Sequence, residues 1–69
     1  MKKVAALVYE LNADGWYATQ DEAGHWFGFK TVDGGYDVTA GIARRTTPYP
    51  RLKDVASHVA FRKRTGWNY

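Results

Sequence analysis

Residues 16–32 of the chain read WYATQDEAGHWFGFKTV. Two runs rich in aromatic and β-branched residues, 16–20 and 25–32, flank the turn-forming residues 21–24, Asp-Glu-Ala-Gly. This arrangement is typical of two antiparallel strands joined by a short loop. The stretch therefore predicts a β-hairpin at the centre of the fold.

Further strand and turn signals extend the hairpin in both directions. Residues 4–11 are a run of β-formers that ends at Asn12-Ala13-Asp14-Gly15, which predicts an earlier strand. Asp33-Gly34-Gly35 marks a third turn. Residues 36–43 follow as a fourth strand, although residues 38–45 could also form a short helix. The sequence thus predicts an antiparallel meander of three to four strands.

Alternation along the strands predicts which side chains share a face of the sheet. A hairpin loop with an even number of residues pairs odd positions with even ones, and all three turns can be read with even loops. One face then becomes apolar, and the opposite face carries Tyr17, Trp26 and Lys30 among polar side chains. The expected apolar face consists of Ala5, Leu7, Tyr9, Leu11, Trp16, Ala18, Phe27, Phe29, Tyr36, Val38, Ala40 and Ile42.

A C-terminal helix is expected to cover the apolar face. Pro50 suits the first turn of a helix and Gly66 suits its end, so the helix should start near Pro50 and stop at Gly66. Apolar residues recur between them at helical spacing, which predicts a stripe that packs on the sheet. This stripe consists of Leu52, Val55, Ala56, Val59 and the aliphatic stem of Lys63.

The resulting order is β-β-β-β-α, an α+β fold with one helix on one face of the sheet. The 69 residues have room for one small domain, residues 1–69, with a single core. The chain has no cysteine, and its apolar run after Lys2 and Lys3 is too short to cross a bilayer. We therefore expect a cytoplasmic protein without disulfides, zinc ribbons or a membrane anchor.

Charge is distributed unevenly along the chain. Residues 1–40 contain three lysines against six acidic residues, whereas residues 41–69 contain seven Lys and Arg against Asp54 alone, a split of −3 and +6. A positive region attracts a phosphate backbone through counterion release, although cations in the last turn also stabilise a helix by themselves. The candidate nucleic-acid contacts are Arg44, Arg45, Arg51, Lys53, Arg62, Lys63 and Arg64.

The open sheet face offers a second candidate contact. Tyr17 and Trp26 are expected on neighbouring strands with Lys30 nearby, and flat aromatic rings beside a cation can stack nucleic-acid bases. These aromatic residues could instead shield the backbone or pair with one another across the strands. Glu10 and Asp37 are expected on the same face and would repel phosphate.

One stretch resembles a known nucleic-acid-binding family. Gly24-His25-Trp26-Phe27-Gly28-Phe29, followed by Asp33-Gly34-Gly35 and Asp37-Val38, is similar to the first ribonucleoprotein motif of the cold-shock domains and the residues after it. The resemblance implies an all-β barrel that binds single strands. It covers only residues 24–38, because the chain has no opening Lys-Trp-Phe strand, no Val-His-Phe second motif and a helical ending. It therefore adds little support for single-strand binding.

Residues suited to catalysis or to metal binding are scarce. Ser57 is the only serine and directly precedes His58, so on a helix the two side chains point about 100° apart. His25 and His58 are far apart in the sequence, and no carboxylate lies at metal-ligand spacing from them. Residues 33–35 join two strands rather than a strand and a helix, unlike a phosphate-binding loop. We expect no catalysis, no metal and no cofactor.

Phe61 points away from the apolar stripe of the helix and is expected to be exposed. The tail residues Trp67 and Tyr69 could fold back over it. Alternatively, Phe61 marks a surface for a partner or for a second copy of the chain, because a small core gains stability from dimerisation.

Two functions remain open from the sequence. The first is a non-enzymatic module that binds DNA or RNA through the basic helix, with Arg44, Arg45 and the aromatic sheet face contributing. The second is a small protein-binding regulator or inhibitor, of the kind that phages and plasmids encode. It would dock an acidic protein, or form a homodimer, through the same cations and Phe61, Trp67 and Tyr69.

Overall fold

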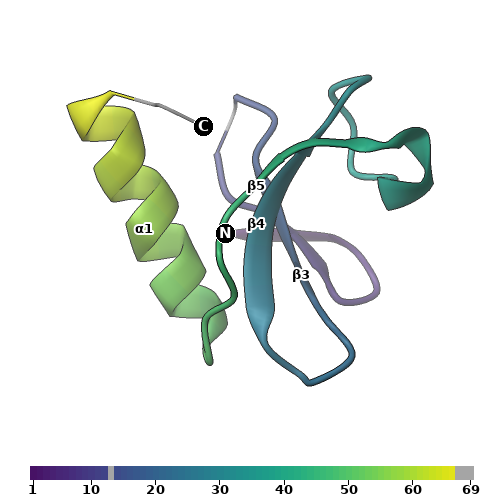
Figure 1. Cartoon of the computed structure of the whole chain (residues 1–69), viewed down its shortest axis with the longest axis horizontal. Helices are drawn as coiled ribbons and strands as arrows, with labels where there is room; N and C mark the ends of the chain where they lie inside the picture. The colour runs from purple at the N-terminus through teal and green to yellow at the C-terminus, as the bar shows by residue number, and fades with distance from the viewer. Residues whose placement is uncertain (13, 67–69) are drawn as a thin grey trace.

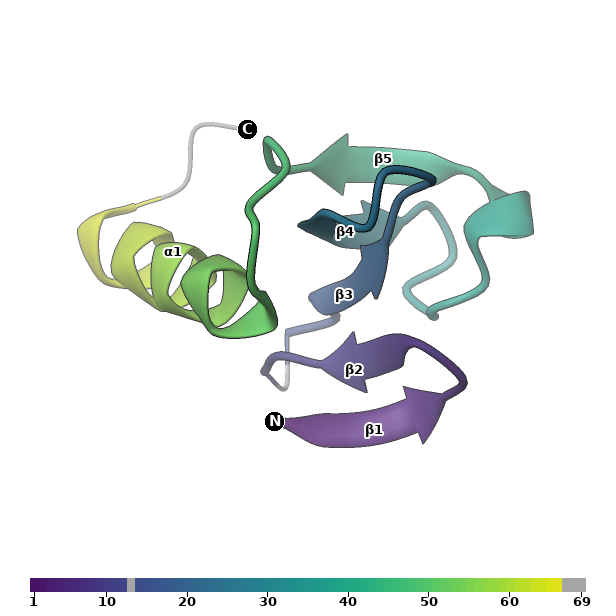
Figure 2. The same cartoon turned by 90° about the horizontal axis from the view of Figure 1, so that it is seen from below.

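The chain folds into an antiparallel sheet with one C-terminal helix. The structure is a computed structural model that describes residues 1–12 and 14–66. Its elements are β1 (Lys2–Ala5), β2 (Val8–Glu10), β3 (Tyr17–Gln20), β4 (Trp26–Thr31), the 3-10 helix η1 (Val38–Ala40), β5 (Ile42–Arg45) and α1 (Leu52–Thr65). The strands form one sheet in the order β1-β2-β3-β4-β5, and α1 lies along one side of it (Figures 1 and 2). This confirms the predicted α+β meander, with five strands instead of three to four.

The additional strand arises because residues 4–11 do not form one continuous strand. The chain turns back at Ala6 and Leu7, so that Ala5 pairs with Val8. Leu7 has a φ of 57°, a left-handed conformation that is rare for a residue with a bulky side chain. The prediction of a single strand is wrong because this loop contains no Gly, Asn or Asp that would signal the turn.

α1 covers the sheet face that carries Ala18 and Gly28. Val55 and Val59 are buried against Trp16 and Ala18, as the apolar stripe predicts. The helix approaches β4 closely, because a Cβ atom at Gly28 would lie 3.2 Å from Val55 Cγ1. Partly buried residues around this core are Leu11, Trp26, Tyr49 and Leu52.

The ends of α1 confirm the predicted helix. Its first residue is Leu52, two positions after Pro50, and Gly66 follows its last turn with a φ of 94°. The linker before it stays on the sheet, because the backbone groups of Trp26 and Tyr49 exchange two hydrogen bonds of 2.7 Å. Thr46 also bonds to β4, since its hydroxyl accepts a hydrogen bond from Gly28 N at 2.9 Å.

Phe27 and Phe29 lie on the sheet face opposite α1, which corrects the predicted register. Phe29 pairs with Tyr17, so that the β3–β4 loop comprises the five residues 21–25 instead of four. Within this loop, Asp21 N donates to His25 O at 2.8 Å and closes a three-residue turn, 22–24, whose last residue, Gly24, is left-handed with a φ of 85°. The one additional residue turns every side chain of β4 to the other face.

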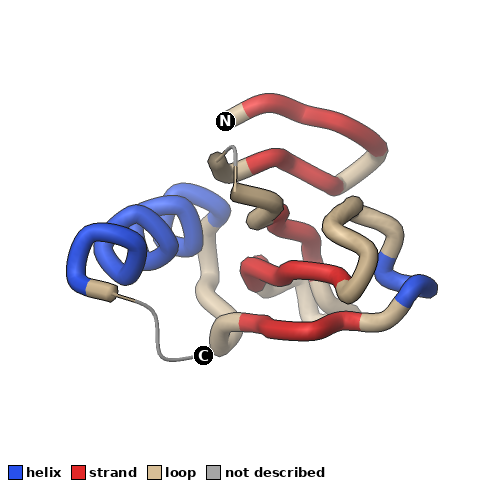
Figure 3. Tube along the Cα trace, turned by 90° about the horizontal axis from the view of Figure 1, so that it is seen from above, coloured by secondary structure: helices blue, strands red, loops and turns tan. Residues whose placement is uncertain are grey.

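A second layer buries the two phenylalanines on that face. Residues 32–41, which include η1, lie on the side of the sheet away from α1 (Figure 3). The ring of Tyr36 lies 5.5 Å from the ring of Tyr17, which in turn lies 6.2 Å from the ring of Phe29. Phe29 is 0% exposed and Phe27 is 7% exposed. The fold therefore has apolar contacts on both faces of its sheet, and not a single core under the helix.

The predicted fourth strand over residues 36–43 is also wrong. Residues 32–36 are turn and bend, and Asp37 then caps η1, because its carboxylate accepts hydrogen bonds from Thr39 N at 3.0 Å and from Thr39 Oγ1 at 2.6 Å. η1 follows, Gly41 has a φ of 105°, and only then does β5 pair with β4. Residues 38–45 are thus a 3-10 helix followed by a strand, which are the two alternatives that the sequence left open.

Candidate functional site

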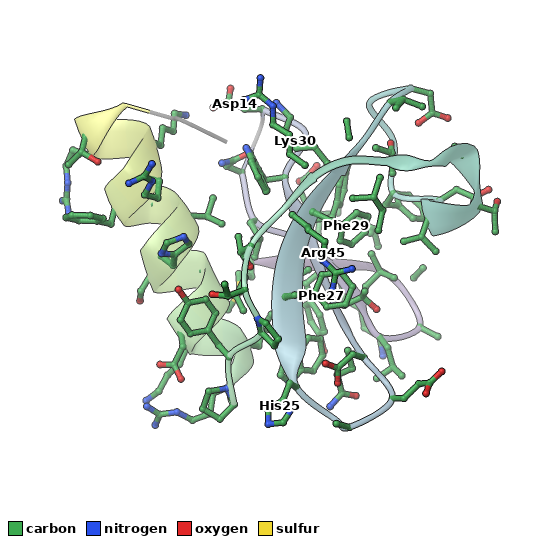
Figure 4. All side chains as sticks on the ribbon, in the orientation of Figure 1. Asp14, His25, Phe27, Phe29, Lys30 and Arg45 are labelled. Atoms are coloured by element: carbon green, nitrogen blue, oxygen red, sulfur yellow. The ribbon has the colours of Figure 1, made fainter. Side chains whose placement is uncertain are left out.

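Five cationic side chains belong to the last turn of α1 and to the facing positions of β4 and β5. Lys30 and Arg44 are paired directly across the two strands, on the face that α1 covers. Lys63 reaches the same region from the last turn of α1, because its Nζ lies 2.7 Å from a carboxylate oxygen of Asp14. Figure 4 shows Asp14 and Lys30 at this end of the molecule. We call this set the basic cluster: Lys30, Arg44, Arg62, Lys63 and Arg64.

Asp14 is the carboxylate that contacts the basic cluster. The hydrogen bond and the positive charge of Lys63 hold the pKa of Asp14 below its usual 3.8, and Lys30 lowers it further. Asp14 is therefore ionised at neutral pH. Counted with Asp14, the five cations of the basic cluster carry a net charge of +4.

The basic cluster is accessible to a ligand. Arg44, Lys63 and Arg64 are exposed, and Arg62 is half-buried. Lys30 is half-buried too, and its Nζ lies 5.8 Å from the centre of the Trp16 ring, a cation–π distance that positions the ammonium group. Within residues 1–12 and 14–66, neither Arg44 nor Arg64 takes part in an ion pair.

The other three predicted basic contacts lie outside the basic cluster. Arg45 follows Arg44 on β5 but faces the opposite side of the sheet, where its guanidinium lies 4.3 Å from the centre of the Phe27 ring (Figure 4). Arg51 and Lys53 lie at the first turn of α1, where Arg51 pairs with Asp54 at 3.2 Å. At about 1.5 Å per residue, α1 separates them from the basic cluster by roughly 15–20 Å. The predicted cations therefore occupy three places and not one surface.

The predicted pairing of Tyr17 and Trp26 on one face is wrong. Trp26 belongs to the helix side of the sheet, where its ring packs at 5.8 Å from that of Tyr9. Tyr17 belongs to the other side, with Phe29 and Tyr36. The odd loop between β3 and β4 separates the two rings, which therefore cannot form one base-stacking surface.

The sequence reasoning missed an apolar groove on the sheet face away from α1. Its rim carries the carboxylates of Asp21, Glu22 and Asp37. Phe27 lies on this face because Gly24 adopts a left-handed conformation, and a glycine at this position of the sequence is compatible with both loop lengths. We call this apolar groove the sheet groove. Its lining includes Ala5, Val8, Thr19, Phe27, Tyr36, Val38, Ile42 and Arg45.

Phe61 is 51% exposed on α1, which confirms that it points away from the sheet. Its proposed companions Trp67 and Tyr69 lie outside the described residues. Whether they cover Phe61 therefore stays a prediction.

The histidines offer no metal centre in the described part of the chain, where no three His, Cys, Asp or Glu side chains form a group. His58 is half-buried, with its ring 5.4 Å from that of Tyr49. Burial lowers the pKa of His58 from 6.5, and the charge of Arg62 lowers it further. His58 is therefore neutral at pH 7.

Within residues 1–12 and 14–66, no helix is long and apolar enough to cross a membrane.

None of the family models, curated proteins or solved structures compared with the chain matches it. The geometry of the basic cluster and of the sheet groove is therefore the basis for a functional proposal.

Proposed function

We propose that this protein is a non-catalytic module that binds nucleic acid through the basic cluster. The observation that carries the proposal is a net charge of +4 on the last turn of α1 and the facing positions of β4 and β5, which the contact of Lys63 with Asp14 brings together. Cations held together by the fold lose less freedom when they bind a phosphate backbone than cations on a flexible tail. Exposed arginines can also bind phosphate oxygens with two hydrogen bonds.

An acidic protein is the alternative ligand for these cations. Protein interfaces gain most of their affinity from aromatic anchors that become buried on binding. Trp16, the aromatic residue beneath the basic cluster, is already 2% exposed, and Phe61 faces away from the sheet. On the side that faces the sheet, the basic cluster thus offers charge without an exposed aromatic anchor, which favours a phosphate backbone over a protein surface.

Fluorescence anisotropy with labelled single- and double-stranded DNA and RNA across a salt series tests this proposal. We expect micromolar or tighter binding at low salt that weakens steeply as salt is added, because binding releases counterions. Arg44→Gln combined with Arg64→Gln should reduce the salt slope by about 2, one for each lost phosphate contact. Asp14→Asn should tighten binding, because it removes the carboxylate from the basic cluster.

A matched control separates the basic cluster from net charge. Arg51→Gln combined with Lys53→Gln removes the same number of charges at the opposite end of α1 and should change the slope little. The proposal fails if this control weakens binding as much as the first pair does. It fails equally if the wild-type protein binds none of the four nucleic acids at low salt.

A further inference from the structure

The sheet groove presents apolar surface that the described chain leaves in contact with solvent. Tyr36, Val38 and Ile42 line it and remain 41%, 44% and 36% exposed. α1 lies on the other side of the sheet and cannot cover the sheet groove of its own molecule (Figure 3). An exposed apolar patch bordered by charges is typical of a surface that binds another protein segment.

The rim of the sheet groove defines the charge of its partner. Asp21, Glu22 and Asp37 line the rim with Arg45 as the cation, and three carboxylates against one cation give −2. The Asp21 carboxylate accepts two backbone N–H groups of its own loop. Hydrogen bonds from Thr39 hold the pKa of Asp37 below its usual 3.8. The rim is therefore negative at neutral pH, and the matching segment is cationic with an apolar anchor.

Two symmetric ways of pairing copies of this chain are disfavoured by charge. Two sheet grooves facing each other would bring two acidic rims together. Pairing along the strand edges would bring cations together, because β1 carries Lys2 and Lys3 and β5 carries Arg44 and Arg45. The sheet groove of one copy therefore needs a different, cationic surface on a second copy.

The outer side of α1 has the required chemistry. Phe61 is 51% exposed there, opposite the buried Val55 and Val59, and Arg64, about one helical turn further along, adds a positive charge on the same side. We propose that the outer face of α1 in one copy, centred on Phe61, docks into the sheet groove of a second copy. Each copy then offers one helix and one sheet groove on opposite sides, so that association is head-to-tail and continues into a chain or a ring.

Sedimentation velocity of the nuclease-treated full chain over a range of concentrations tests this inference. At low salt the average mass should rise beyond two chains as concentration increases, and added salt should reverse the rise. Phe61→Ala, which removes the anchor, and Val38→Arg, which blocks the sheet groove, should each remain monomeric. Val32→Arg is the matched control, because Val32 is 68% exposed outside the sheet groove, and it should associate like the wild type.

Mixing the two monomeric variants gives the decisive measurement. Phe61→Ala keeps an intact sheet groove and Val38→Arg keeps an intact helix face, so an equal mixture should form a complex of two chains and nothing larger. A mixture that stays monomeric overturns the inference, as does a wild-type protein that remains a single chain at every concentration. Loss of association in Val32→Arg would also overturn it, and circular dichroism verifies that each variant is folded.

Discussion

Gly28 sets the distance at which α1 packs on the sheet. It is buried in β4, and a Cβ atom at this position would lie 3.2 Å from Thr46 Cγ2, 3.2 Å from Val55 Cγ1 and 3.4 Å from Val59 Cγ2. All three neighbours are β-branched, and such side chains have few alternative rotamers. An additional methyl group at Gly28 therefore has to displace the helix or the linker.

We expect Gly28→Ala to lower the free energy of unfolding by about 1–3 kcal/mol, the usual cost of overpacking. Alanine normally stabilises a strand relative to glycine, so the sign of the change reports the steric conflict. Urea denaturation measures it. Gly35→Ala is the control, because the nearest atom to its Cβ would be Asp33 Oδ1 at 3.5 Å, an ordinary contact. A Gly28→Ala variant as stable as the control would show that α1 is not packed this closely.

The β1–β2 hairpin contains a local conformational strain at the scale of one element. Leu7 occupies the second position of the two-residue loop with a φ of 57°, whereas Ala6 has no positive φ. A side chain in the left-handed region costs roughly 1–2 kcal/mol, which glycine does not incur. The Leu7 side chain is 54% exposed, so its packing offsets only part of this strain.

Leu7→Gly should therefore raise the free energy of unfolding, by up to about 1 kcal/mol. Ala6→Gly is the matched change at the neighbouring position and should lower it by roughly 0.5–1 kcal/mol, because only flexibility is added. Both values can be obtained from the same urea titrations. Equal losses in the two variants would contradict a left-handed Leu7.

The elements differ in how far the sequence predicts them. α1 could be predicted because its stripe and its ends are local signals, and Val55, Val59 and Gly66 lie where the spacing places them. Which face each side chain of β4 occupies could not be predicted, because it depends on whether the loop before β4 has four or five residues. Asp21-Glu22-Ala23-Gly24 is compatible with both, and the left-handed Gly24 selects five.

The candidate sites could likewise be predicted where they depend on local sequence and could not where they depend on long-range pairing. The cations in the last turn of α1 could be placed from sequence, because helical spacing alone brings them together. The pairing of Lys30 with Arg44 could not be predicted from the sequence, because η1 and an irregularity after Lys30 set the register of β4 and β5. The sheet groove was missed since it requires both Phe27 on that face and residues 36–42 folded beside it.

At the scale of the whole molecule, the sheet separates two surfaces of opposite charge. Lys30, Arg44 and Lys63 of the basic cluster lie on the side of α1, and the rim of the sheet groove lies on the other side with a charge of −2. The charge split along the sequence is thus kept only in part, because Arg45 lies with the carboxylates of the sheet groove and Asp14 lies with the cations of the basic cluster. Such a molecule can bind a polyanion on one side while its other side repels it.

The stability of the whole fold should decrease on acidification in two stages. The first belongs to His58, whose pKa in the fold is below its usual 6.5 because of burial and the charge of Arg62. The unfolded chain therefore binds this proton more readily than the folded chain does. Stability is complete above pH 6.5 and begins to fall below it, and His58→Gln should remove this first decrease.

The second stage belongs to carboxylates. The pKa values of Asp14, Asp33 and Asp37 lie below their usual 3.8, through hydrogen bonds from Lys63, Thr31 and Thr39 respectively. Each carboxylate stabilises the fold above 3.8 and loses that contribution as pH falls through its lower folded value. Urea titrations from about pH 8 to about pH 3 should therefore show two separate decreases. Asp33→Asn should reduce only the second decrease, because Thr31 then donates to a group that does not titrate. A second decrease as large as that of the wild type would show that this hydrogen bond does not favour the ionised carboxylate.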